Sequence, residues 1–167
     1  MPSDTTMTTG AAAAASLPAQ LRKLAAAMRV GSERVEPEHG YYLSLYDYGN
    51  GVRCAACALS AALVGTLAPD ISVATYIQRL HHNSRALTIG MDYDREVIRA
   101  ALPVLDASYT GSSTTAELGY GSHRRLDSEP LSWFDAVEGL FERCLWDIPR
   151  IADWLDSEAT RLQASAS

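Results

Sequence analysis

The sequence predicts a mostly helical protein, a compact bundle of five or six helices with one short β-hairpin at about residues 41–53. Apolar side chains recur three and four residues apart in several segments, which is typical of helices that pack one face on a core. Gly49-Asn50-Gly51 is a strong hairpin-turn signal, because these residues tolerate positive φ angles. The length of 167 residues is that of a single domain.

The expected boundaries of that domain follow from local composition. Residues 1–15 are rich in Thr, Ser, Gly and Ala, so we expect a flexible tail there. A single helical domain should then cover residues 16–162, and residues 163–167 should fray. Residues 107–130 contain many Gly, Ser and Thr residues and predict one long loop. Loops of this length in compact domains are either functional or mobile.

The first half of the chain predicts two helices around the hairpin. The first helix should begin at the N-cap residue Ser16 and end at Gly31. The second, Cys54–Val64, is rich in alanine and leucine and is apolar on nearly every side. We therefore expect Cys54–Val64 to be the central, buried helix.

The second half predicts further helices separated by polar or proline-containing segments. Helices are expected over about Ser72–His82 and Asp92–Leu105, with a connector at residues 83–91 and a bend or end at Pro103.

Near the C-terminus, Ser132 and Asp135 predict a capping box, and Asp147 predicts the N-cap of a last helix. The inward stripe of the helix after Ser132 should consist of Phe134, Val137, Phe141 and Leu145.

Composition and charge bear on compartment and partners. The net charge of −6 argues against a surface that tracks nucleic-acid phosphates. Three cysteines are no disulfide framework, which favours a reducing compartment. The longest apolar run covers roughly a dozen residues, whereas a membrane span needs about 20. With no cationic leader at the N-terminus, we expect a cytoplasmic protein without membrane or nucleic-acid partners.

The motif Cys54-Ala55-Ala56-Cys57 is the sharpest chemical feature. At the start of a helix, two cysteines three residues apart face one side, and the helix dipole lowers the pKa of the first thiol. Cys54 and Cys57 are therefore candidate catalytic residues of a dithiol redox site. The alternative is that both are small core residues of a buried helix. The motif resembles the redox helix of the carboxymuconolactone decarboxylase and alkylhydroperoxidase family, which has a histidine at the position of Ala61.

Metal binding is a second possibility for the same cysteines. They would supply half of a tetrahedral zinc site, with His81 or His82 completing it. Adjacent histidines on a helix point in different directions, and no second cysteine pair is present, so we predict neither metal nor cofactor. With Asp92 and Asp94 the histidines would alternatively form a polar cluster. The simpler interpretation is that the histidines end one helix and the aspartates cap the next.

Four tyrosines accompany the predicted hairpin and are candidate binding residues: Tyr41, Tyr42, Tyr46 and Tyr48. Because alternate side chains of a strand face opposite ways, about half of these should be exposed. Tyrosine is favoured at protein interfaces, since its ring buries area while its hydroxyl stays hydrated. The alternative is that the hairpin packs all four into its own core. His39, beside them, is expected to be a loop histidine.

Two separate stretches resemble a group of small bacterial and phage-type proteins of no established activity. Cys57–Ala62 corresponds to a helix similar to CALGAA, and Trp146–Leu155 corresponds to a C-terminal segment that ends in IADWL. The preceding stretch LRKLAAAMRV fits as well. These are packing motifs, so the resemblance implies a fold and no function.

No complete catalytic set can be assembled from these residues. We therefore expect a protein that is not an enzyme, a small intracellular binding or regulatory module that acts through protein–protein contacts. Its partner would be another protein or a second copy of the chain. The competing class is a thiol-dependent oxidoreductase centred on Cys54 and Cys57.

Overall fold

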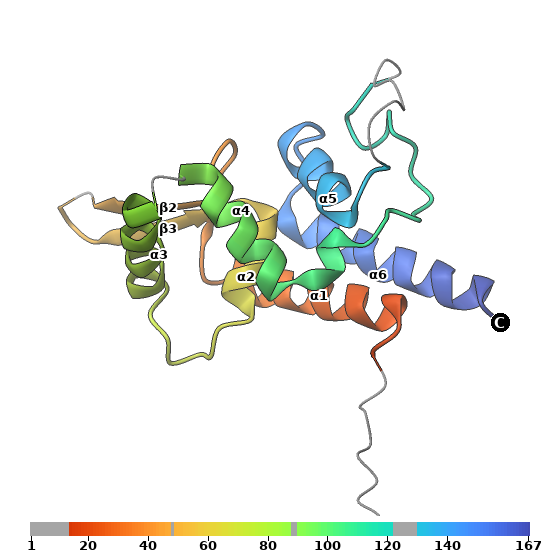
Figure 1. Cartoon of the computed structure of the whole chain (residues 1–167), viewed down its shortest axis with the longest axis horizontal. Coiled ribbons are helices and arrows are strands. Elements are labelled where there is room, and N and C mark those ends of the chain that lie inside the picture. The colour runs from red at the N-terminus through yellow and green to blue at the C-terminus, as the bar shows by residue number, and fades with distance from the viewer. Residues whose placement is uncertain (1–13, 48, 88–89, 122–129) are drawn as a thin grey trace, which may run out of the picture.

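A computed structural model describes residues 14–47, 49–87, 90–121 and 130–167 (Figure 1). In that part of the chain, the expected class is confirmed: the fold is mostly helical with one small sheet. None of the described helices is long and apolar enough to cross a membrane. The elements are α1 (Leu17–Ser32), β1 (Glu36–Pro37), β2 (Leu43–Asp47), β3 (Val52–Ala56), α2 (Ala58–Gly65), α3 (Val73–Leu87), α4 (Gly90–Ala101), the 3₁₀ helix η1 (Pro103–Asp106), α5 (Trp133–Glu142) and α6 (Ile148–Ser165).

Helix α2 is the centre of the fold, as expected, and it packs on α1 at very short range. Every residue from Ala58 to Val64 is buried. A Cβ atom added to Gly31 would lie 1.7 Å from the carbonyl oxygen of Ala61, and one added to Gly65 would lie 1.8 Å from that of Ala27. The two helix backbones therefore touch, and only glycine fits at these positions.

The predicted start of this central helix, at Cys54, is wrong. Cys54–Ala56 form the end of strand β3, and the helix begins only at Ala58. The sheet has the order β1-β3-β2, with β1 parallel and β2 antiparallel to β3. Residues 54–56 pair with Leu43–Leu45 on one side, and β1 pairs with Ala55 and Ala56 on the other. Strand pairing on both sides overrides the helix propensity of alanine.

The predicted hairpin is confirmed, but its first strand begins at Leu43 rather than Tyr41, and its second strand continues to Ala56. Its register places Leu43 opposite Ala56 and Asp47 opposite Val52. Gly49 and Gly51 in the turn have φ angles of 77° and 148°. Helix α3 packs against β2 and β3 (Figure 1).

Helices α3 and α4 differ from the expected boundaries. Helix α3 continues to Leu87, through part of the segment predicted to be a connector. Helix α4 ends at Ala101, and Pro103 starts η1 instead of continuing the helix to Leu105. Leu102 has φ −129° and ψ 68°, because a residue before proline is disfavoured in the α region.

The helix caps near the C-terminus agree with the sequence. The Ser132 hydroxyl accepts from Asp135 N at 3.2 Å, and the Asp135 carboxylate accepts from Ser132 N at 2.9 Å, which completes the capping box. Asp147 accepts from Arg150 N at 2.8 Å and caps α6. Helix α6 lies along α1, where Arg29 forms an ion pair of 2.7 Å with Asp153.

One side chain ties the sheet region to the far end of α2. The guanidinium of Arg34 donates to the carbonyl oxygens of Val64, Leu67 and Ile71 at 3.2, 3.1 and 2.8 Å. These carbonyls belong to the last turn of α2 and the segment after it, where helical hydrogen bonds have ended. Arg34 therefore acts as a C-terminal cap of the central helix.

Candidate functional site

The four predicted tyrosines do not form one surface. Tyr41 is 59% exposed, whereas Tyr42 is only 8% exposed and belongs to the core. Tyr46 is half-buried, and its hydroxyl donates to a carboxylate oxygen of Glu38. Tyr48 lies outside the described residues. Among the three described tyrosines, only Tyr41 is largely exposed.

Tyr42 has a structural role. Its ring centroid lies 6.3 Å from that of Phe134, and its hydroxyl donates to Glu138 Oε1 at 2.9 Å. Burial, and after it the charge of Glu138, raise the pKa of Tyr42. The hydroxyl therefore remains protonated at neutral pH, and it fastens the start of β2 to α5.

Helix α5 also holds the segment that carries Tyr41. The imidazole of His39 stacks on Phe141 with ring centroids 4.2 Å apart. The backbone N–H of Gly40 donates to Glu142 Oε2 at 2.9 Å, and His39 Nδ1 lies 3.7 Å from the same oxygen. These contacts fix the backbone immediately before Tyr41, so its exposed ring projects from a positioned segment.

The corner between α5 and α6 presents a second exposed apolar side chain. Leu145 was predicted to face inward, but α5 ends at Glu142 and Leu145 is 68% exposed. Its φ angle is +54°, in the left-handed region, which costs a non-glycine residue about 1–2 kcal/mol. Leu145 therefore carries backbone strain without the compensation of apolar burial. A strained, exposed apolar residue is an observation from which a functional hypothesis can be drawn.

Glu142 links the segments that carry Tyr41 and Leu145. Gly40 binds the Glu142 carboxylate directly, and Leu145 follows Glu142 by three residues. Bond lengths along this connection limit the separation of the Tyr41 and Leu145 Cα atoms to about 25 Å at most. A standard protein interface buries about 800 Å² per partner, which corresponds to a patch roughly 30 Å across. We call Tyr41 and Leu145 the corner patch.

Arginines held on aromatic rings flank Leu145 along the chain. The guanidinium carbon of Arg143 lies 3.9 Å from the ring centroid of Tyr120, and that of Arg150 lies 3.8 Å from the ring centroid of Trp146. Exposed apolar side chains accompanied by aromatic residues and arginine are typical of protein interfaces. Chemically, the corner patch can bury apolar area against a partner, but it contains no catalytic group.

The prediction that the two cysteines of the CxxC motif share one face of a helix is wrong. Cys54 lies on β3, and Cys57 is the N-cap of α2 in an extended conformation. Three residues of extended chain separate their Cα atoms by about 10 Å and direct the side chains to opposite faces. A disulfide needs Cα atoms within about 7 Å, so this backbone cannot close one.

The environments of these thiols also differ from those of reactive cysteines. Cys57 is 4% exposed, and burial raises its pKa to about 11 despite nearby backbone N–H groups at the start of α2. Its sulfur lies 3.6 Å from Ser60 Oγ. Burial also raises the pKa of Cys54. Both thiols are therefore protonated at neutral pH, whereas redox catalysis requires the thiolate.

The expectation that His81 and His82 end a helix is wrong, because both lie inside α3, which continues to Leu87. His81 is half-buried, with Nε2 3.2 Å from the carbonyl oxygen of Leu43, whereas His82 is exposed. Burial raises the pKa of Asp94, and the charge of His81 opposes this effect. The side chain of Asp92 lies outside the described residues. In the described part of the chain, no three His, Cys, Asp or Glu side chains gather in a way that could hold a metal ion.

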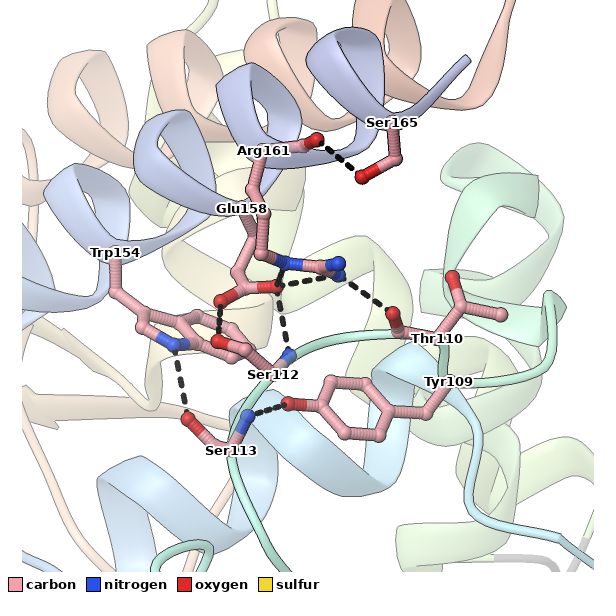
Figure 2. A network of polar contacts seen from close by, with 8 residues as sticks. All are labelled: Tyr109, Thr110, Ser112, Ser113, Trp154, Glu158, Arg161 and Ser165. Carbon is pink, nitrogen blue, oxygen red and sulfur yellow. Dashed lines mark hydrogen bonds and ion pairs between the residues drawn. The ribbon is translucent and has the colours of Figure 1, made fainter.

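A polar network that the sequence did not suggest fastens the long loop to α6 (Figure 2). Glu158 is 4% exposed, and its carboxylate accepts from the backbone N–H of Ser112 at 2.9 Å and from the Ser112 hydroxyl. Arg161 donates to the same carboxylate at 3.0 Å and to the carbonyl oxygen of Thr110 at 2.6 Å. Trp154 Nε1 donates to Ser113 Oγ at 3.3 Å. Residues 110–113 are therefore anchored to the domain.

No protein-family model matches the chain, and comparisons with curated proteins and with solved structures find no match either.

Proposed function

We propose that this protein is a small binding module that acts on another protein through the corner patch, Tyr41 and Leu145. The observation that carries the proposal is Leu145, which is exposed and strained at the same time. Both features cost free energy in the isolated chain. Contact with a partner would bury the side chain and offset this cost.

The arrangement around Tyr41 supports the same function. An exposed aromatic ring on a fixed backbone loses little conformational entropy on binding, because the contacts of His39 and Gly40 already hold the segment. Such rings are frequent among residues that dominate binding energy. The cysteines offer no competing catalytic arrangement, since Cys54 and Cys57 point to opposite faces of an extended segment.

Quantitative affinity capture from a lysate of the source organism tests this proposal. The variant Leu145→Asn removes the apolar side chain, and Asn tolerates the left-handed backbone, so the fold is expected to survive. The matched control is Val30→Asn on α1, because Val30 is also an exposed aliphatic residue, with 48% exposure. We expect Leu145→Asn and Tyr41→Ser to lose a specific captured protein that wild type and Val30→Asn retain. Equal capture by all four proteins would overturn the proposal.

A further inference from the structure

A groove lies on another part of the molecule, between α1 and the junction of α4 with η1. It encloses about 560 Å³, within the range of roughly 300–1,000 Å³ that is usual for small-molecule sites. Buried apolar residues contribute to its walls, including Leu24, Leu102 and Val104. The complete lining is Ala15, Gln20, Lys23, Leu24, Ala27, Thr66, Ala101, Leu102, Pro103 and Val104.

The polar groups of the groove are few and have specific roles. Gln20 donates its side-chain amide to the carbonyl oxygen of Ala15 at 2.5 Å, and the Thr66 hydroxyl donates to that of Leu63 at 2.6 Å. Both groups are thus engaged within the chain. Among the described residues that line the groove, Lys23 is the only charged one.

Lys23 differs from its cationic neighbours on α1. Arg22 donates to Gln163 Oε1 at 2.9 Å, and Arg29 pairs with Asp153 on α6. Lys23 is exposed, and its ammonium group forms no hydrogen bond or ion pair with any residue in the described part of the chain. In a protein of net charge −6, an unpaired ammonium group at an apolar groove is a local positive site.

We propose that this groove binds an amphipathic carboxylate, with an alkyl chain along the apolar walls and the carboxylate beside the Lys23 ammonium. The apolar lining favours the alkyl chain of the ligand, and the single cation favours a single negative charge at one end of the ligand. The proposal is independent of the corner patch and concerns a different set of residues.

Isothermal titration calorimetry of the full chain with decanoate tests the proposal. We expect saturable one-to-one binding that strengthens with chain length, because each fully buried methylene contributes about fourfold. Decanoate should therefore bind up to about fifteenfold more tightly than octanoate. Absence of saturation below the concentration at which decanoate forms micelles would overturn the proposal.

Charge variants test the role of Lys23. An exposed ion pair contributes up to about fivefold in affinity, so Lys23→Gln should weaken decanoate binding by about that factor, and Lys23→Glu by more. Arg22→Gln, on the same helix but outside the groove lining, is the control and should bind as wild type does. Decan-1-ol lacks the negative charge, so its affinity should not change in the Lys23→Gln variant. Equal binding of decanoate to wild type, Lys23→Gln and Lys23→Glu would refute the assigned orientation.

A groove-filling variant tests the location. Ala101 is exposed and lines the groove, so Ala101→Trp should fill it and abolish decanoate binding without unfolding the protein. The control is Ala26→Trp, because Ala26 is exposed on α1 and is not part of the lining. Unchanged binding to Ala101→Trp would place the ligand elsewhere and overturn the proposal.

Discussion

The contact between α1 and α2 leads to a prediction about Gly31→Ala. The new Cβ would start 1.7 Å from the carbonyl oxygen of Ala61, and real Cβ contacts are essentially never shorter than 3.0 Å. The backbones must therefore separate locally by about 1.3 Å. The clashing atom belongs to the backbone of a buried helix, so no side-chain rotation relieves the contact.

The size of the effect follows from two opposing terms. Alanine in place of glycine favours a helix by about 1 kcal/mol. Overpacking a rigid contact costs about 3 kcal/mol or more at the upper end of its range. The variant should therefore lose about 2 kcal/mol in free energy of unfolding.

Urea denaturation followed by circular dichroism measures this loss as a lower midpoint at unchanged slope. Ala26→Gly, at an exposed position of the same helix, is the control and reports the propensity term alone, a loss of about 1 kcal/mol. If Gly31→Ala were as stable as wild type or more stable, the close contact of α1 with α2 would be wrong.

Three further predictions concern the loop, a thiol and a cap. Glu158→Ala removes the carboxylate that anchors Ser112, so amide hydrogen exchange should accelerate over residues 110–113; unchanged protection there would contradict the anchoring role. The pKa of Cys57 in the folded state, about 11, lies above its ordinary value of 9.0, so the unfolded thiol loses its proton first. The stabilising contribution of Cys57 is thus complete below pH 9 and declines between about pH 9 and 11. Chemical denaturation of wild type and Cys57→Ala across that range measures the decline. If the free energies of unfolding of the two proteins changed in parallel with pH, the prediction would be refuted. Ser132→Ala removes the α5 cap and should cost about 1 kcal/mol, whereas Ser157→Ala, at an exposed position inside α6, should change stability little.

Elements whose ends are encoded locally could be predicted from the sequence. The caps Ser16, Ser132 and Asp147 satisfy backbone N–H groups with their own side chains, so a few adjacent residues determine where α1, α5 and α6 begin. The hairpin turn is local in the same sense, because Gly49 and Gly51 adopt the positive φ angles that glycine permits.

Features that depend on distant partners could not be predicted in this way. Cys54–Ala56 have the composition of a helix, but strands on both sides hold them extended. Nothing near Glu158 in sequence indicates that Ser112, 46 residues away, will bind its carboxylate.

Only one of the two residues of the corner patch could be assigned to the surface from the sequence. Tyr41 belonged to the predicted tyrosine surface, but Leu145 continued the apolar spacing of α5 and so was assigned to the core. A signal was present: Asp147 starts the next helix, so α5 had to end a few residues earlier. A residue in the left-handed region after a helix is normally a glycine, and here it is Leu145. The local residue types therefore did not indicate this conformation.

Site-specific photo-crosslinking tests the central claim most directly. A photoreactive phenylalanine analogue placed at position 145, at position 41 or at the control position 30 is irradiated in cells of the source organism. We predict one discrete protein adduct of the same mass from positions 145 and 41 and none from position 30, because only the corner patch would contact the partner. Adducts from position 30 as abundant as those from positions 145 and 41, or none from either patch position, would contradict a binding function for this surface.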